Sequence, residues 1–299
     1  MTDLQRLIER AETLLTRLEN HFFISPDPPN WQIVYACRWY KRKLSQGFFQ
    51  EIRHPHQICL QDLKGIDLQK QDIDRNTKQF LCGQPANNVL LWGSRGTGKS
   101  SLIKALLNEY ASQGLRLVEI EKYDLIDLPE IIDIFYPCPE RFIIFCDDLS
   151  FEQDDPSYKA LKSVLDGSIG TPPKNVLIYA TSNRRHLLPE YFRENLATHA
   201  LDGEIHHSEA IEEKISLSDR FGLWLSFYPF KQEEYLMIVH HWLSKLGTFQ
   251  HEDVDQAALQ WALMRGSRSG RTAWQFAQDW AGRIALSKYN QFEKNNTLF

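Results

Sequence analysis

Hydrophobic residues follow two alternating patterns in the central part of this chain. Short apolar runs, each as long as a buried strand and rich in valine, isoleucine, leucine and phenylalanine, are separated by segments with helical spacing. The runs cover residues 88–92, 115–120, 142–146, 176–181 and 223–227. This alternation is typical of a parallel sheet with crossover helices on both faces, which binds ligands beyond the carboxyl ends of its strands. We therefore expect an α/β domain with a five-stranded parallel sheet.

The segments on either side of the predicted sheet have helical periodicity. Residues 1–20 predict an amphipathic helix, and residues 31–44 predict a second helix with a basic face that is solvated or contacts nucleic acid. The C-terminal part predicts helices over residues 235–246, 256–264 and 272–287. The predicted organisation is an N-terminal helical region, an α/β domain and a helical C-terminal domain, over residues 1–55, 56–228 and 229–299.

Composition and charge narrow the class of protein. The net charge of -5, from 34 basic and 39 acidic residues, creates no global attraction to nucleic acid or anionic lipid. The five cysteines include no Cys-x-x-Cys pair, and no apolar run approaches the roughly 20 residues that span a bilayer. We expect a cytoplasmic protein with reduced thiols and no membrane partner.

The strongest motif is a phosphate loop that follows the first apolar run and opens a helix. Its eight positions are Gly93, Ser94, Arg95, Gly96, Thr97, Gly98, Lys99 and Ser100. The glycines allow successive backbone N–H groups to face phosphates, while Lys99 reaches the β and γ phosphates and Ser100 offers a hydroxyl to Mg²⁺. The predicted nucleotide-binding set extends to Ser101. This motif predicts ATP and Mg²⁺ as ligands.

A second acidic motif follows the strand predicted at residues 142–146. Asp147 and Asp148 come directly after that strand, as in a Walker B segment. Asp147 is predicted to assist Mg²⁺, and Asp148 to act as the general base toward the attacking water. The alternative is a pair of helix-capping aspartates.

With these motifs in this order, the chain resembles the AAA+ ATPases over residues 63–276. The resemblance implies a three-layer P-loop NTPase sandwich with N-terminal helices and a C-terminal helical lid. Asn183, after the strand at 176–181, is similar to the sensor 1 residue that orients the lytic water. Arg220, just before the last strand, resembles an arginine finger that reaches the nucleotide of a neighbouring subunit. The alternatives are a turn asparagine and a surface pair of Asp219 with Arg220.

Two further positions follow from the same resemblance. Arg271 is similar to the sensor 2 arginine of the lid, with Arg268 as the alternative and a solvated arginine cluster as the structural interpretation. Ile66 resembles a linker residue that packs against adenine. One departure is Asp148, since many members have glutamate there; turnover is expected to be slow, with Glu152 as a substitute base.

The chain is most similar to an uncharacterised bacterial AAA+ family of ATP-binding proteins that carries a domain of unknown function, through residues 85–93 and 216–227. That resemblance implies ATP binding and the fold but no substrate. The preferred hypothesis is an ATPase that assembles into a ring or arc and remodels or loads an unidentified protein or nucleic-acid partner, using the charged segment near residues 204–213 or its N-terminal helices. The alternatives are a nucleotide-gated adaptor that hardly hydrolyses ATP and a small-molecule kinase.

Overall fold

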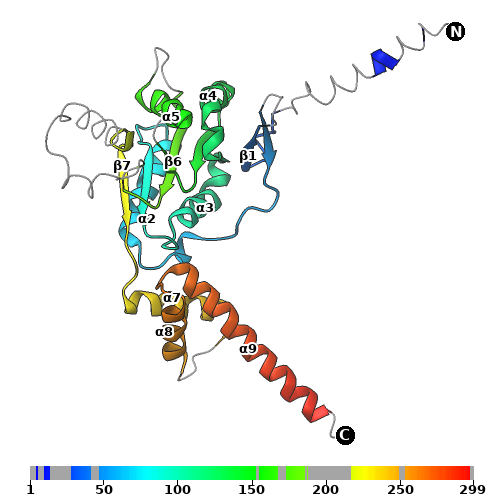
Figure 1. Cartoon of the computed structure of the whole chain (residues 1–299), viewed down its shortest axis with the longest axis vertical. Helices are drawn as coiled ribbons and strands as arrows, with labels where there is room; N and C mark the ends of the chain where they lie inside the picture. Colours follow the sequence, from blue (N-terminus) through cyan, green and yellow to red (C-terminus); the bar gives the residue numbers. More distant parts are fainter. Residues whose placement is uncertain are drawn as a thin grey trace, which may run out of the picture.

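The computed structural model describes residues 5, 10–13, 28–41, 47–152, 155–167, 173–185, 187, 217–248 and 253–296. Within these residues the chain forms an α/β body with a group of helices, α7, α8 and α9, at one end (Figure 1). The predicted N-terminal helix and the charged segment near residues 204–213 lie almost wholly outside the described residues.

From residue 89 onward, strands and helices alternate as the sequence predicts. The strands are β1 Ala36–Tyr40, β2 Phe48–Glu51, β3 Val89–Gly93, β4 Leu115–Glu119, β5 Arg141–Cys146, β6 Val176–Ser182 and β7 Leu223–Phe227. The helices of the body are η1 Leu60–Asp62, α2 Asp67–Leu81, α3 Lys99–Tyr110, η2 Ala111–Gln113, η3 Lys122–Asp127, α4 Leu128–Phe135 and α5 Pro156–Asp166. The remaining helices are α7 Gln232–Lys245, α8 Val254–Met264 and α9 Gly270–Asn296.

The strands form one seven-stranded sheet in the order β2-β1-β4-β5-β6-β3-β7. The five predicted strands are its contiguous parallel part, from β4 to β7. The prediction of five strands is wrong in number, because β1 adds parallel to β4 and β2 adds antiparallel to β1. Since β5, β6 and β3 lie side by side in this order and run parallel, their carboxyl ends meet at the same edge of the sheet.

The predicted helix over residues 31–44 is wrong, because residues 36–40 form β1. Cys37 and Trp39 are buried, while Arg38 between them faces away and pairs with Glu119 at 2.7 Å, which is the two-residue period of a strand. The free edge of β4 supplies backbone partners, as in the 2.9 Å bond from the Leu117 N–H to the Tyr35 carbonyl. The sequence alone contains no sign of that edge.

Helices cover both faces of the sheet. Along β3, Val89 and Leu91 pack into the apolar cluster that contains α2 and α3, whereas Leu90 packs into the cluster that contains α4 and α5. All three side chains are fully buried. Burial on both faces explains why each strand reads as a continuous apolar run.

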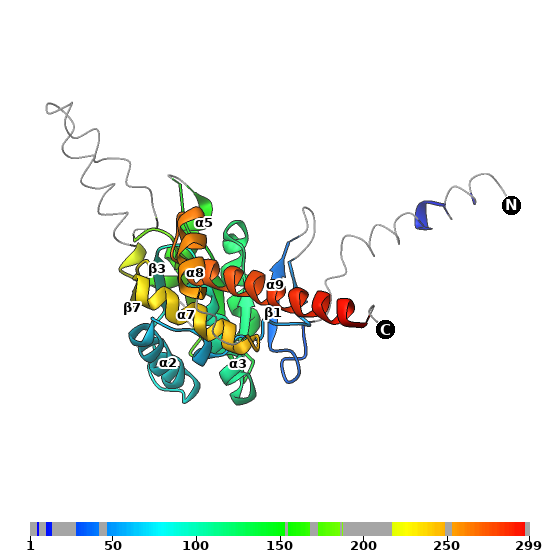
Figure 2. The same cartoon turned by 90° about the horizontal axis from the view of Figure 1, so that it is seen from below.

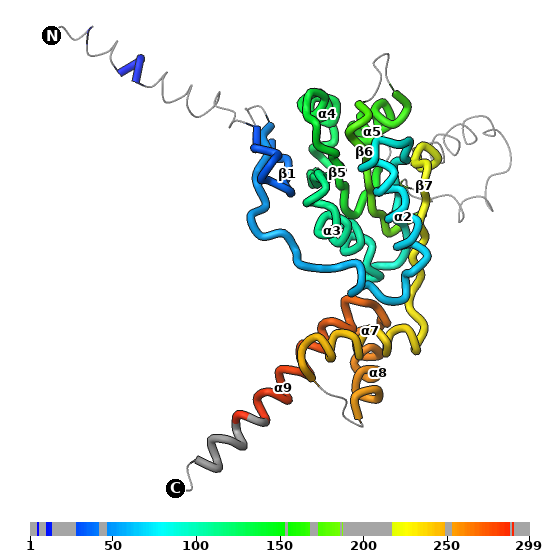
Figure 3. The backbone as a smooth tube through the Cα atoms, turned by 180° about the vertical axis from the view of Figure 1, so that it is seen from behind, coloured from blue at the N-terminus to red at the C-terminus, as the bar shows by residue number. Residues whose placement is uncertain are grey.

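The C-terminal helices, which we call the lid, lie across the end of the body (Figure 2). Their core includes Tyr235 of α7, whose hydroxyl donates to the Ala258 carbonyl at 3.1 Å, and the edge contact of Trp242 with Trp274, whose ring centroids are 4.7 Å apart. The three predicted C-terminal helices are confirmed. Beyond this core α9 runs away from the body (Figure 3). Among the helices of the described ranges, none combines the length and the apolar character that crossing a membrane requires.

Candidate functional site

The phosphate loop connects β3 to α3 and depends on glycine at two close approaches. Gly93 has φ 127°, and a Cβ there would lie 2.0 Å from the Phe227 carbonyl oxygen of β7. The next residue, Ser94, donates its N–H to that same oxygen at 2.9 Å. Gly96 has φ 73°, and a Cβ would meet the Ser269 hydroxyl of the lid at 2.8 Å. The loop is thus packed between β7 and the lid, and side chains at these positions would displace it.

Lys99 lies beneath this loop and is 7% exposed. Its Nζ donates to the carbonyls of Gly93 at 2.7 Å and Ser94 at 2.8 Å, and to Asn183 Oδ1 at 3.3 Å. Burial lowers the pKa of Lys99; the carboxylates of Asp147 and Asp148 oppose this, and Arg95 and Arg271 add to it. The ammonium therefore lies in a partly desolvated place where an anion would be a strong partner.

The first acidic residue after β5 is joined to the start of α3. Ser100 Oγ donates to Asp147 Oδ1 at 2.6 Å, and Thr181 Oγ1 of β6 donates to the same oxygen at 2.5 Å. A hydroxyl and a carboxylate side by side are oxygen donors of the kind that Mg²⁺ prefers, usually with several waters retained. Among the described residues no group of three or more histidine, cysteine or acidic side chains forms a metal cage. As oxygen donors, Ser100 and Asp147 fit Mg²⁺.

The second acidic residue is held by an unusual backbone. Asp148 is the non-glycine residue with positive φ, 51°, in the described part of the chain. Its N–H donates to Thr181 Oγ1 at 2.9 Å, and its Oδ1 accepts a hydrogen bond from Asn183 Nδ2. Its Oδ2 lies 3.7 Å from Arg95 Nη2. The turn thus aims the carboxylate at the phosphate loop and at the end of β6.

The lid contacts the phosphate loop through the first turn of α9. Ser269 precedes that helix and accepts the N–H of Thr272 at 3.2 Å, which determines where the helix begins. The N–H of Arg271 then donates to the Gly96 carbonyl at 3.3 Å. Arg271 lines the site, whereas Arg268, two residues before the helix, is exposed and does not. Of the two arginines named as alternatives, Arg271 is the one at the site.

These groups surround a cavity of about 770 Å³ between body and lid. The predicted residues that line it are Ile66, Arg95, Gly96, Thr97, Gly98, Lys99, Ser100, Ser101, Asp147, Asp148, Asn183 and Arg271. Gly93 and Ser94 lie below it, where their carbonyls bind Lys99. Its apolar side is formed by residues 58–66, which precede α2 and which we call the linker, and by the C-terminal part of the chain. The apolar side chains are Leu63, Ile66, Phe230, Ile238, Trp242 and Trp274. The lining therefore combines apolar side chains with a group of charged and polar ones, and we call the part formed by Lys99, Asp148 and Asn183 the charged end of the cavity.

The sequence did not point to several residues of this site. Thr181 forms hydrogen bonds with both aspartates. The sequence offered a clue to it, because Thr181 stands near the carboxyl end of β6, two residues before Asn183, and residues two apart along an extended chain point to the same side. Asp62 of η1 pairs with His241 at 3.2 Å and with Lys245, which ties the linker to α7. Burial raises the pKa of Asp62, but hydrogen bonds from Lys245, the Cys59 N–H and His241 outweigh it, so the pKa lies below its usual value.

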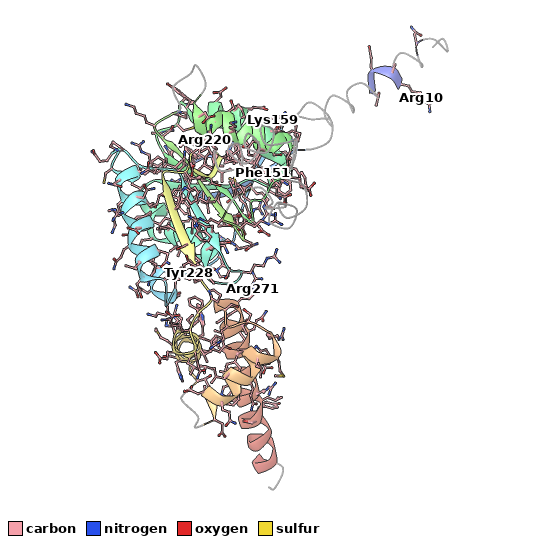
Figure 4. All side chains as sticks on the ribbon, turned by 60° about the vertical axis from the view of Figure 1, so that its left-hand side comes forward. Arg10, Phe151, Lys159, Arg220, Tyr228 and Arg271 are labelled. Carbon is pink, nitrogen blue, oxygen red and sulfur yellow. The ribbon has the colours of Figure 1, made fainter. Side chains whose placement is uncertain are left out.

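Two predicted residues lie away from the cavity. Arg220 precedes β7 at the end opposite the lid, whereas Arg271 lies where the lid meets the body (Figure 4). The Arg220 guanidinium pairs with Asp166, the last residue of α5. Glu152 is exposed and does not line the cavity. Neither residue is among those that line the cavity of its own chain.

Comparisons with known proteins identify the fold. The model of a family described as "Protein of unknown function (DUF815)" matches residues 32–284. The 26S proteasome regulatory subunit 6B homolog of Schizosaccharomyces pombe is 32% identical over 107 residues, which cover 31% of this chain and 27% of that protein.

Solved structures match over more of the chain. The RuvB Holliday junction branch migration motor of Thermotoga maritima superposes with a TM-score of 0.54 at 15% identity, covering 77% of this chain and 66% of the motor. A variant of the same motor has a TM-score of 0.55 at 15% identity with the same coverage. The chain thus spans about a quarter of the proteasome subunit and just under two thirds of the motor. The chain has the AAA+ fold.

Proposed function

The chain belongs to the DUF815 family, and we propose that it is an ATPase that binds ATP with Mg²⁺ and hydrolyses it as an assembly of several copies. One observation carries this proposal. Lys99, Asn183 and Asp148 form a continuous line of contacts at the charged end of the cavity, beside the Ser100–Asp147 pair. These are the cation, the water-orienting amide, the base and the metal ligands that phosphoryl transfer requires.

ATP binding is supported by the two ends of the cavity. The phosphate loop presents backbone N–H groups and Lys99 to the phosphates, and the N-terminus of α3 adds its dipole. The apolar side, which includes Ile66, suits a purine ring. Arg271 approaches from the lid side and is proposed to contact the phosphates of the nucleotide that the lid covers.

Mg²⁺, held through Ser100 and Asp147, would supply Lewis-acid stabilisation of the charge on the phosphates. In the proposed hydrolysis, Asn183 orients a water molecule and Asp148 accepts its proton. The water oxygen forms the new bond to the γ-phosphorus, the bond from that phosphorus to the β–γ bridging oxygen breaks, and the products are ADP and inorganic phosphate. Asp148 is shorter than glutamate, which supports slow turnover.

Assembly is proposed from the position of Arg220. A cation that precedes β7 and lies outside the cavity of its own chain has the placement of an arginine that serves a neighbouring copy. Such an arginine stabilises the transition-state charge. The similar proteins are a proteasome regulatory subunit and a branch migration motor, and this similarity supports a macromolecular partner that is remodelled or loaded.

The test is ATP turnover per subunit as a function of protein concentration, with gel filtration in the presence and absence of ATP. We expect turnover to rise with concentration and to disappear in Lys99→Ala. The control is Arg75→Ala, which removes an exposed arginine paired with Asp72 on α2, outside the cavity. Tight ATP binding with no turnover in a single-turnover measurement would contradict the ATPase proposal and support the nucleotide-gated adaptor.

A further inference from the structure

The third position of the phosphate loop is Arg95, which the mechanism above does not use. Its Nη2 lies 3.7 Å from Asp148 Oδ2, and its side chain is 77% exposed at the rim of the cavity. The phosphate-loop pattern leaves this position unspecified, so the arginine adds a charge that the loop geometry does not need. The question is what this charge contacts.

Arg95 lies at the γ-phosphate end of the cavity. Lys99 contacts Asn183, Asn183 contacts Asp148, and Asp148 faces Arg95, so the four side chains follow one another around the charged end. In a phosphate loop the lysine reaches the β and γ phosphates. The positive charge of Arg95 is also felt at Lys99, where it is among the causes of the lowered pKa. Both cations therefore act on the same small region.

The pair between Arg95 and Asp148 is weak. A separation of 3.7 Å exceeds a hydrogen bond, and an ion pair this exposed contributes little. A terminal phosphate carries more charge than a carboxylate and offers several oxygens, and a guanidinium binds two of them at once. A γ-phosphate in the cavity would therefore compete successfully with Asp148 for the Arg95 side chain.

We propose that Arg95 exchanges between Asp148 and the γ-phosphate of ATP, so that Asp148 Oδ2 is freed from the nearby guanidinium when ATP is bound. This inference rests on the proposed ATPase function. Asp148 Oδ1 accepts a hydrogen bond from Asn183, and the guanidinium of Arg95 lies 3.7 Å from Oδ2. When Arg95 turns to the γ-phosphate, Oδ2 is left to accept the proton of the attacking water. ADP has no γ-phosphate and leaves the pair intact.

The first test measures the affinities of wild type, Arg95→Ala and Arg95→Lys for ADP and for a non-hydrolysable imido analogue of ATP, with Mg²⁺, by calorimetry. We expect Arg95→Ala to weaken analogue binding by about tenfold or more, the effect of a charged hydrogen bond, and ADP binding less than twofold. Arg95→Lys should retain part of the preference. Equal losses for the two nucleotides, or no loss for either, would overturn the proposal. Arg75→Ala is the matched control.

The second test addresses the exchange itself through a double-mutant cycle. Asp148→Asn removes the competing carboxylate, so we expect it to bind the ATP analogue more tightly than wild type. That gain should be largely absent when Arg95→Ala is the background. A gain of equal size in both backgrounds would mean that Asp148 acts on ATP only through general repulsion, and the exchange would be refuted.

Failure of this inference is distinguishable from failure of the proposed function. If wild type hydrolyses ATP and Arg95→Ala keeps the wild-type ratio of analogue to ADP affinity, the ATPase proposal stands and the Arg95 inference falls. If wild type binds neither nucleotide, both fall. Circular dichroism and thermal unfolding of each variant check that the affinities refer to folded protein.

Discussion

The charged end of the cavity and the surroundings of Arg220 are built in opposite ways. Lys99, Asp148 and Asn183 come from neighbouring strand ends and contact one another within one chain. Arg220 lies outside that cavity and pairs with Asp166 at the end of α5. The comparison shows that parallel strands bring one set of charged groups together inside a chain, whereas Arg220 would meet such a set only in the proposed assembly of several copies.

The largest expected effect is that of Arg220, and it tests whether this arginine acts on the site of another copy. Arg220→Ala should reduce turnover by about 10³-fold, the lower end for arginines of this kind, with ATP affinity changed only slightly. Mixing Arg220→Ala with Lys99→Ala should restore part of the activity, because one variant keeps the phosphate site and the other keeps the arginine. Turnover of the mixture over a range of ratios is the measurement. No recovery, with both variants still assembling, would contradict an arginine that acts between copies.

The second expected effect concerns Thr181, whose hydroxyl group forms hydrogen bonds with Asp147 and Asp148 of the same chain. Thr181→Val keeps the shape of the side chain but removes the hydroxyl that bonds both aspartates. We expect turnover or Mg²⁺ affinity to fall by about 10- to 100-fold, as for other groups that orient metal ligands. Steady-state rates against Mg²⁺ concentration measure it. Thr77→Val, which removes a buried hydroxyl bonded to the Ile73 carbonyl, is the matched control. Equal rates in the two variants would count against the role of Thr181.

The third expected effect concerns how much the lid contributes to ATP affinity. Arg271→Ala should weaken ATP binding by about tenfold, because Arg271 lines the cavity and a charged contact is lost. Arg268→Ala should change affinity less than about twofold, since Arg268 is exposed outside the cavity. Calorimetric titration of both variants gives the comparison. The reverse order of effects would show that the lid rearranges when nucleotide binds.

The smallest effect concerns the tie between linker and lid. The pKa of Asp62 is lowered in the fold, so its stabilising contribution is fully present above the usual value of 3.8 and disappears as pH falls below it. We expect Asp62→Asn to lower the free energy of unfolding by about 1 kcal/mol at pH 7, because Lys245 is half exposed and the pair is screened. The difference should persist at pH 5 and shrink at pH 3.5.

Urea unfolding at the three pH values measures this difference. Asp67→Asn, which removes an exposed carboxylate that pairs with Lys70, is the control. A difference that grows as the pH falls would contradict the sign derived from the Asp62 pKa.

Local patterns in the sequence predicted the parts of the molecule that are local. The five strands from β4 to β7, the lid helices and the order of the motifs follow from apolar periodicity and from glycine spacing. The phosphate loop could be predicted from the sequence because all of its diagnostic residues lie within eight consecutive positions. The two aspartates could be predicted because they directly follow the apolar run of β5.

Local sequence patterns specify which residues stand at the strand ends of the candidate site. Which side chains those residues contact depends on how distant segments pack. Residues 36–40 form β1 because the edge of β4 provides backbone hydrogen-bond partners. Thr181 contacts the two aspartates because β5 and β6 are neighbouring strands. Arg271 reached the cavity because Ser269 starts α9 beside Gly96. Each of these contacts joins segments far apart in the chain, and periodicity within one segment carries no information about the other.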